Sequence, residues 1–174
     1  MTNPARSVQL RGEAEYRDQG ESLLQRPGDA VFVRRGALRS VLMSCPDGCG
    51  ETLVVNLDPR AGKAWRLDTR GGNVTIFPSV WREGGCGSHF IVWRGKILWC
   101  DRFEGGNVEP AYDGVLLERR VLTALRKNTL RSTEEIAAEL DEIAWEVMRA
   151  GHALVRRGLA VSGGLKQRDW FALA

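Results

Sequence analysis

The sequence predicts an α+β protein in which a β-rich part precedes a helical part. Short segments rich in β-branched and aromatic residues alternate with turn residues up to about Phe103, and apolar residues then recur with a helical period. With 43% hydrophobic and 27% charged residues, the 174-residue chain has the composition of a globular protein with a packed core. Its length suits one ordinary domain or two small ones.

Six segments of the first part are predicted strands. Each is bounded by turns that contain glycine or proline. Arg94 and Gly95 separate the last two segments closely enough to predict a tight hairpin. The first thirty residues are polar and predict at most one strand, around Val8. The predicted strands are Ala30–Val33, Arg39–Met43, Thr52–Asn56, Asn73–Phe77, Phe90–Trp93 and Lys96–Trp99.

A glycine-rich segment separates the two parts and is followed by three predicted helices. We expect a linker at residues 105–114 between domains at residues 1–104 and 115–174. Apolar residues between Val115 and Leu125 predict the first helix. Ser132 followed by Glu135 is a capping-box pattern, which predicts the start of the second. The third is expected from about Glu142 to Arg157.

Gly158 ends the third predicted helix, and residues 159–161 and 170–173 are expected to form a closing pair of strands. The order helix, helix, helix, hairpin resembles the winged helix-turn-helix domains of bacterial regulators. The resemblance covers roughly the last sixty residues and concerns core positions chiefly, so it implies a fold more than it implies DNA binding.

Two glycine-rich turns hold three of the four cysteines and one of the two histidines. Cys45 and Cys49 lie in one turn, and Cys86 and His89 lie in another about forty residues later. Two ligand pairs on turns separated by strands are typical of structural zinc, which prefers four thiolate or imidazole ligands in a tetrahedron. The sequence therefore predicts a small zinc-ribbon-like domain with zinc on Cys45, Cys49, Cys86 and His89.

Alternatives remain open for these residues. Cys100 could replace His89 as the fourth ligand, or the cysteines could be buried free thiols. A site of three cysteines would leave a position for a catalytic water, which His89, Asp47, Glu83 or Asp101 could assist. The chain contains neither a His-Glu-x-x-His helix nor a zinc-deaminase pattern. We therefore expect a closed structural site and assign no catalytic residue.

Two further features are expected to be structural. Ser88 and His89 are neighbours in an extended segment, so their side chains point to opposite faces and do not suit a nucleophile and its base. Four tryptophans of the first part could form a stacking platform, but a small β domain usually needs such large side chains in its core. These are Trp65, Trp81, Trp93 and Trp99.

Residues from about 27 to 100 resemble a bacterial family of unknown function whose members lie beside genes for ubiquitin-like conjugation. The resemblance is carried by Pro27–Val33, Arg39–Gly50, Val74–Trp81, Cys86–Phe90 and Gly95–Trp99. It implies a metal-binding accessory protein of a ubiquitin-like modification pathway, with the same three cysteines and His89 as ligands. It does not specify a reaction.

The charge pattern gives weak support for nucleic-acid binding. The net charge is +3, without a polybasic block. Trp145, Arg149, His152 and Arg156 form one stripe of the third predicted helix, which we expect to bind a protein. Nucleic acid is less favoured because the carboxylates of Asp141, Glu142 and Glu146 stand where phosphates would approach.

The sequence contains no apolar run long enough to cross a membrane and does not begin like a signal peptide, so we expect a cytoplasmic protein. We expect a non-enzymatic adaptor of a ubiquitin-like pathway, held together by zinc and docked through the winged helix. Two alternatives are a zinc-dependent peptidase that removes ubiquitin-like modifiers and a winged-helix DNA-binding regulator.

Overall fold

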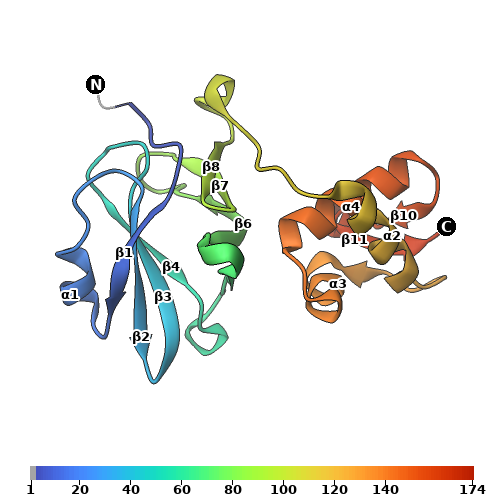
Figure 1. The fold of residues 1–174 in the computed structure, drawn as a ribbon, viewed down its shortest axis with the longest axis horizontal. Helices are drawn as coiled ribbons and strands as arrows, with labels where there is room; N and C mark the ends of the chain where they lie inside the picture. The colour runs from blue at the N-terminus through green and yellow to red at the C-terminus, as the bar shows by residue number, and fades with distance from the viewer. Residues whose placement is uncertain (1–2) are drawn as a thin grey trace. The chain divides into compact units, whose positions relative to one another are not determined.

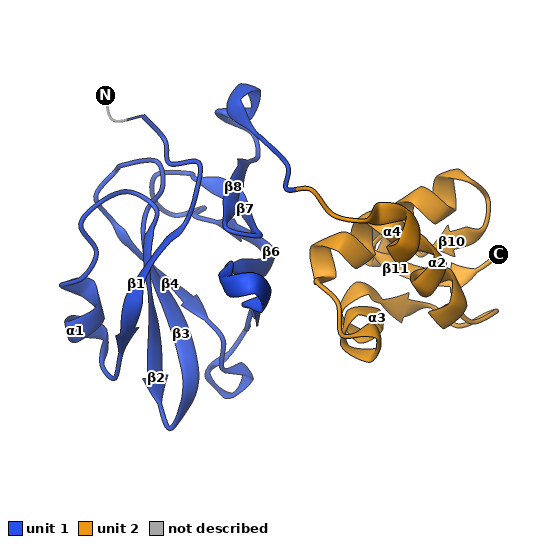
Figure 2. Cartoon of the chain, in the orientation of Figure 1, with its two compact units in different colours: residues 1–110 blue, residues 111–174 orange. Residues whose placement is uncertain are grey.

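The computed structural model describes residues 3–174 of an α+β protein. The chain divides into two compact units, residues 1–110 and residues 111–174 (Figures 1 and 2). The division falls inside the segment that we expected to be a linker. Within the described residues, no helix has both the length and the apolar character needed to cross a membrane.

The first unit contains two four-stranded sheets, with strand orders β1-β2-β3-β4 and β5-β6-β7-β8. β1 and β2 are parallel, and the other neighbouring strands are antiparallel. The strands are β1 (Gln9–Ala14), β2 (Asp29–Arg35), β3 (Ala37–Ser44), β4 (Thr52–Asn56), β5 (Arg66–Asp68), β6 (Thr75–Trp81), β7 (His89–Trp93) and β8 (Lys96–Trp99). All six predicted strands are confirmed, whereas β1 lies largely beyond the strand expected near Val8 and β5 was not predicted.

The two sheets share one apolar core. Alternate residues of β2, β3 and β4 from one sheet and of β6, β7 and β8 from the other are buried together. Phe90 of β7 is fully buried, and its ring lies 5.6 Å from the ring of Trp99 on β8. Trp93 and Trp99 are buried, as expected for packing residues, whereas Trp81 is 57% exposed. Burial of this apolar surface is the main force that holds the sheets together.

The parallel pair β1 and β2 is joined across the short helix α1 (Arg17–Glu21). Asp29 at the start of β2 is buried and accepts hydrogen bonds from Arg11 Nε at 2.7 Å and from the N–H groups of Gln25 and Arg26 at 2.9 Å. A buried carboxylate requires such partners to offset the loss of water. These bonds fix the loop that enters β2.

The tight hairpin predicted at Arg94 and Gly95 is confirmed. Trp93 pairs with Lys96 across the turn, and both turn residues have positive φ, 46° for Arg94 and 75° for Gly95. Two consecutive positive φ values are typical of a type I′ turn, whose twist matches that of the flanking strands.

The second unit contains three helices and a small antiparallel sheet of order β10-β11-β9. Its elements are α2 (Gly114–Ala124), β9 (Arg131–Ser132), α3 (Thr133–Leu140), α4 (Ala144–Arg156), β10 (Ala160–Ser162) and β11 (Trp170–Leu173). The predicted capping box is confirmed, because the Ser132 hydroxyl accepts from the Glu135 N–H and the Glu135 carboxylate accepts from the Ser132 N–H. Among the described residues, short 3-10 helices lie at Pro59–Ala61, Arg70–Gly72 and Glu104–Gly106 in the first unit and at Leu165–Gln167 in the second.

The start of α4 differs from the expected arrangement of carboxylates. The helix begins at Ala144, so Asp141 and Glu142 precede it. Glu142 is paired with Arg120, and Glu146 is 2% exposed. Two of the three carboxylates, Glu142 and Glu146, therefore no longer argue against nucleic-acid binding.

Candidate active site and metal centre

The β6–β7 pair brings a serine and a histidine together on one face. Trp81 lies opposite His89 in the register of the two strands, and Ser79 precedes Trp81 by two residues on the same side of β6. Ser79 is therefore a diagonal neighbour of His89, a spacing that suitable side chains can bridge. The Ser79 hydroxyl lies 3.1 Å from Nε2 of His89.

An aspartate reaches the other nitrogen of the same imidazole. Cys100 follows β8 directly, and its N–H donates to the carbonyl of His89 at 2.9 Å. Asp101 comes next, with φ of 65°, and its Oδ2 lies 2.8 Å from Nδ1 of His89. The imidazole is 23% exposed and the aspartate 69% exposed, so the group lies at the surface and is open to a substrate.

Ser79, His89 and Asp101 thus form a continuous chain of hydrogen bonds in the order of a serine–histidine–aspartate triad. When Nδ1 carries the proton and donates to Asp101, Nε2 is free to accept the hydroxyl proton of Ser79. Trp81 stacks on His89, with ring centroids 5.4 Å apart and an interplanar angle of 29°. The hydrogen bonds act at the edge of the imidazole ring, whereas the indole covers one of its faces. Stacking therefore restricts tilting of the ring.

The cysteine turns converge on a second cluster. One ligand atom from each of Cys45, Asp47, Cys49 and Cys86 lies within 4.8 Å of the others. The sulfurs of Cys45 and Cys86 are 3.6 Å apart, and the Asp47 carboxylate accepts from the Cys49 N–H at 2.8 Å. Three thiols and one carboxylate could hold a metal ion, and a sulfur-rich donor set of four suits zinc.

Burial and hydrogen bonding alter the acidity of this cluster. Burial raises the pKa of the Cys45 thiol and, less strongly, that of Cys49. Burial alone would also raise the pKa of Asp47, but hydrogen bonds from the Cys45 thiol and the Cys49 N–H outweigh it and hold that pKa well below its usual range. The carboxylate is therefore ready to bind a cation, and metal binding would displace the thiol protons.

The structure groups three of the four predicted ligands and separates the fourth. Cys45, Cys49 and Cys86 lie together, with Asp47 among them. His89 lies outside this group, because its two ring nitrogens face Asp101 and Ser79. Cys100, the alternative ligand, also lies outside the group among the described residues.

The two clusters are joined by one short segment and one arginine. Cys86 and His89 are separated by Gly87 and Ser88, and the buried Ser88 hydroxyl accepts from the Cys86 thiol at 3.1 Å. Arg102, which follows Asp101, donates through Nη2 to the Cys86 carbonyl at 3.1 Å and lies 3.7 Å from the Asp47 carboxylate. A rigid cysteine cluster would therefore hold two segments in place: the one that leads from Cys86 to His89 and the one that follows Asp101.

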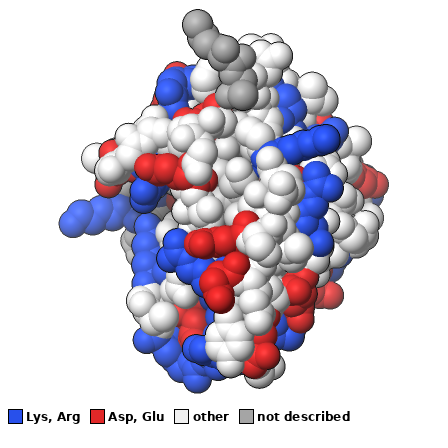
Figure 3. Space-filling view, turned by 90° about the vertical axis from the view of Figure 1, so that its left-hand side faces the viewer, with Lys and Arg blue, Asp and Glu red and all other residues white. Residues whose placement is uncertain are grey.

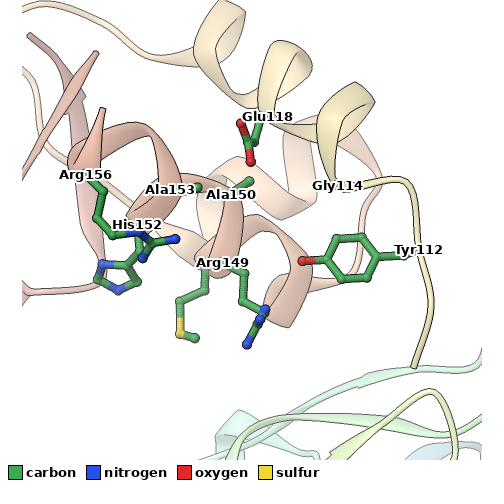
Figure 4. A pocket seen from close by; sticks show the side chains of 9 residues that line it. Tyr112, Gly114, Glu118, Arg149, Ala150, His152, Ala153 and Arg156 are labelled. Carbon is green, nitrogen blue, oxygen red and sulfur yellow. The ribbon is translucent and has the colours of Figure 1, made fainter. Parts of the chain in front are cut away.

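The binding stripe expected on the third helix is divided in the structure. Trp145 is 6% exposed and belongs to the core of the second unit. Arg149, His152 and Arg156 line a pocket of about 360 Å³, together with Tyr112 and other residues (Figure 4). His152 Nε2 lies 2.8 Å from a carboxylate oxygen of Asp169, so it also has a structural contact.

Charges are mixed on the face of the molecule shown in Figure 3, where basic and acidic side chains lie interspersed. This agrees with the modest net charge of +3. An interspersed surface favours solubility over the attraction of a polyanion.

Sequence reasoning did not single out Ser79, which contacts His89 in the structure. The predicted strand ended at Phe77, whereas β6 continues to Trp81, and within it the spacing of two from Ser79 to Trp81 places both side chains on one face. The register against the strand of His89 could not be read, because the intervening segment 82–88 does not fix how the two strands pair. Asp101 was considered only as a helper of metal-bound water.

Comparison with known proteins supports the context inferred from the sequence. No curated protein and no solved structure matches the chain. One family model matches residues 16–100, a segment just short of half the chain that contains Ser79, His89 and the whole cysteine cluster and ends one residue before Asp101. Over residues 16–100 the chain is thus similar to the family described as "Bacterial ubiquitination-like system serine protease (BubE)".

Proposed function

We propose that the protein is a serine peptidase of a bacterial ubiquitin-like modification system, with Ser79 as nucleophile, His89 as general base and Asp101 as the group that orients the imidazole. The observation that carries the proposal is the chain of hydrogen bonds from Ser79 Oγ through His89 to Asp101, with contacts of 3.1 and 2.8 Å. Nucleophilic acyl transfer requires an imidazole within hydrogen-bond reach of the attacking hydroxyl and a carboxylate within reach of the other imidazole nitrogen.

The reaction follows the roles of these three groups. His89 Nε2 accepts the proton of the Ser79 hydroxyl while Oγ attacks the scissile carbonyl of an ester or amide. The imidazolium then donates this proton to the leaving group, which leaves an acyl group on Ser79. Water, deprotonated by His89, releases the acyl group and restores the enzyme. Asp101 stabilises the imidazolium and holds Nδ1–H in place.

We propose this function in place of the non-enzymatic adaptor that we expected from the sequence, and, among enzymes, in place of the zinc-dependent peptidase. A zinc peptidase needs an open metal position with an acid or base beside it. Here Asp47 lies among the three cysteines as a possible fourth ligand, while the imidazole contacts Ser79 and Asp101. The matched family is described as a serine protease of a ubiquitination-like system, which supports a substrate joined to a ubiquitin-like modifier.

We assign a structural role to the cysteine cluster. Zinc on Cys45, Cys49, Cys86 and Asp47 would supply a rigid crosslink between the two glycine-rich turns. Cys86 lies three residues before His89, and Arg102 ties the segment after Asp101 to the Cys86 carbonyl. The cluster would therefore act by holding the backbone of the proposed triad in register, without taking part in the reaction.

Active-site labelling tests the proposal. A fluorophosphonate reacts with an activated serine and with few others, so the purified full-length protein should gain one label at Ser79, located by peptide mass spectrometry. Ser79→Ala and His89→Ala should abolish labelling, and Ser40→Ala, a partly exposed serine of β3, should not. A folded wild-type protein that neither reacts with the probe nor hydrolyses a conjugate would reject the assignment.

We further propose that the second unit is a winged-helix-like module that docks a protein partner. The element order α2, β9, α3, α4, β10, β11 and the sheet order β10-β11-β9 support the fold assignment. The exposed Arg149 and Arg156 at the α4 pocket support an acidic partner surface. Arg149→Glu with Arg156→Glu should weaken partner capture, whereas salt-dependent DNA retention lost in the same variant would favour nucleic acid.

A further inference from the structure

A groove opens beside the proposed nucleophile. Its volume is about 350 Å³, and it lies between β4, the end of β6 and Trp65, with Arg17 at its border. Four of its lining residues, Leu53, Val55, Trp65 and Val80, are apolar and buried or partly buried. The Trp65 indole N–H donates to the carbonyl of Ser79 at 3.2 Å, so the wall of the groove contacts the backbone of the nucleophile.

Two strand edges border this groove. Among the described strands, β4 is the last of its sheet and pairs with β3 alone, and its Asn56 carbonyl accepts from the Trp65 N–H at 2.8 Å. β5 pairs with β6 only at residues 75–77, so β6 continues past its neighbour on that side. Arg82 N–H donates to Ser88 O on the β7 side, and the alternation of an antiparallel ladder then turns the backbone groups of Ser79 and Trp81 toward the β5 side. The Ser79 carbonyl on that side already accepts from the Trp65 indole, so an added chain would pair with the backbone groups of Trp81.

Open strand edges beside a nucleophile are suited to binding an extended chain. Edge N–H and C=O groups can pair with an added strand, and pockets for alternate side chains then give specificity. Because the side chains of a strand alternate, one residue of such a peptide would enter the apolar groove while its neighbour faced the side that carries Ser79.

The charge of the groove also points to a particular peptide. Its lining residues include Arg17 and Arg82 but neither aspartate nor glutamate. Each arginine holds a partner carboxylate elsewhere, Glu21 for Arg17 and Glu51 for Arg82, in ion pairs whose side chains are all more than one-third exposed. Exposed pairs contribute little, so exchange of a partner for a substrate carboxylate costs little.

Resting on the proposed function, we propose that this groove is the substrate site of the peptidase and takes an extended peptide segment that pairs with the edge of β6. The peptide inserts an apolar side chain between the sheet edges and presents an acidic side chain to Arg17 and Arg82. The groove thus selects a flexible, unfolded segment such as a chain terminus or linker, because a segment already paired within a sheet has no free backbone groups to offer.

A scanning library of acetylated tetrapeptide coumarin amides tests the selection with the full-length protein. Cleavage should favour Leu, Val or Phe at one position and Asp or Glu at another. In the best peptide, N-methylation of the backbone amide that pairs with β6 should lower kcat/KM by about tenfold, the cost of one hydrogen bond at the upper end of the usual range. Selection for basic residues, or indifference to N-methylation at every position, would overturn the proposal.

Charge reversal supplies the matched variants. Arg17→Glu should lower kcat/KM for the acidic peptide by about three- to tenfold and improve cleavage of its lysine counterpart. Arg34→Glu removes an exposed arginine of β2 that pairs with Glu13 and lies outside the groove, and it should leave kcat/KM for both peptides unchanged. An equal loss in both variants would show a general charge effect and would overturn the assignment of the groove.

A binding measurement separates the groove from the chemistry. The Ser79→Ala protein should bind the selected peptide, read by the anisotropy of a label on the peptide, and Arg17→Glu added to it should weaken binding. Should the wild-type protein cleave no library member, the library is screened for binding instead. Selective binding without hydrolysis would support the groove as a peptide-binding site and reject the peptidase activity. Hydrolysis that neither Arg17→Glu nor N-methylation changes would support the peptidase activity and reject the groove as its substrate site.

Discussion

The Ser79 hydroxyl lies 3.1 Å from Nε2 of His89, although the two residues belong to different strands. Ser79 lies where the register of β6 against β7 shifts, between Ile76 and Val80. Such irregularities re-aim side chains and are common next to active sites. The pairing of Trp81 with His89 after the shift then sets the diagonal relation of the serine to the imidazole.

Ser79→Ala should reduce hydrolysis of a susceptible peptide or modifier conjugate by about a thousandfold or more, since removal of a triad nucleophile leaves only binding and electrostatic assistance. The thermal unfolding midpoint should change little, because Ser79 is partly exposed and loses one hydrogen bond. Steady-state kinetics and calorimetry on the same preparation check both parts. Ser40→Ala should match the wild type, and a similar loss there would point to damaged folding.

Asp101→Asn should lower kcat by up to about 10⁴-fold while leaving KM nearly unchanged. The amide favours the wrong imidazole tautomer, so Nε2 carries the proton and cannot act as a base. Single-turnover kinetics with the best peptide measure the change in the chemical step. Glu83→Gln alters an exposed acid in the nearby loop and serves as the control. Full activity of Asp101→Asn would leave Ser79 and His89 as an unassisted pair.

Strands bounded by clear turns could be predicted from the sequence, and elements that depend on distant partners could not. Thr52–Asn56 and Lys96–Trp99 have the predicted bounds, because β-branched runs between glycine turns are a local signal. β1 is polar, with alternating partial exposure, and forms only by pairing with β2. β5 has three residues, too few for a periodic pattern.

The candidate site was predictable to the extent that it is local. Cys45 and Cys49 share one turn, and the glycines around them made their convergence foreseeable. The position of His89 could not be foreseen, since a histidine three residues after a cysteine fits both a metal ligand and the first residue of a strand. Asp47 joined the cluster because its carboxylate caps the turn through the Cys49 N–H.

The protein should contain about one zinc ion per chain by elemental analysis. Cys45→Ser should abolish metal binding, and Asp47→Asn should weaken it by about ten- to a hundredfold, since a neutral amide is a poor replacement for a carboxylate ligand. A chelator should lower the unfolding temperature of the first unit. Cys100→Ser is the matched control, because Cys100 lies outside the cluster. Metal loss in that variant, or metal-free wild-type protein, would contradict the assignment.

Asp29→Asn should destabilise the first unit by about 2 to 3 kcal/mol, because the amide cannot replace the buried carboxylate as acceptor from three donors. Burial alone would raise the pKa of Asp29, but hydrogen bonds from Gln25, Arg11 and Arg26 outweigh it and hold the pKa below its usual range. This contribution is therefore fully present above about pH 4 and is lost as the pH falls through the lower folded value.

Hydrogen exchange of the β2 amides in increasing urea measures this effect. The difference between Asp29→Asn and the wild type should shrink as the pH is lowered from 6 toward 3. Glu15→Gln changes an exposed acid of the same region and should have little effect at any pH. A difference that stays constant with pH would show that the charge of Asp29 contributes nothing to stability.

Gly151→Ala tests the packing of the second unit. A Cβ at Gly151 would lie 2.4 Å from Cε2 of Phe171, an aromatic residue that is fully buried in β11. Neither α4 nor the ring can move without disturbing the core, so the added methyl group should cost about 1 to 3 kcal/mol. The higher helix propensity of alanine offsets at most about 1 kcal/mol of this cost. Gly164→Ala adds the same methyl group in open space at a φ of −69° and should be tolerated. Hydrogen exchange of the α4 amides measures the stability of the two variants. Equal stability of the Gly151→Ala and Gly164→Ala proteins would mean that α4 and β11 pack less closely than described.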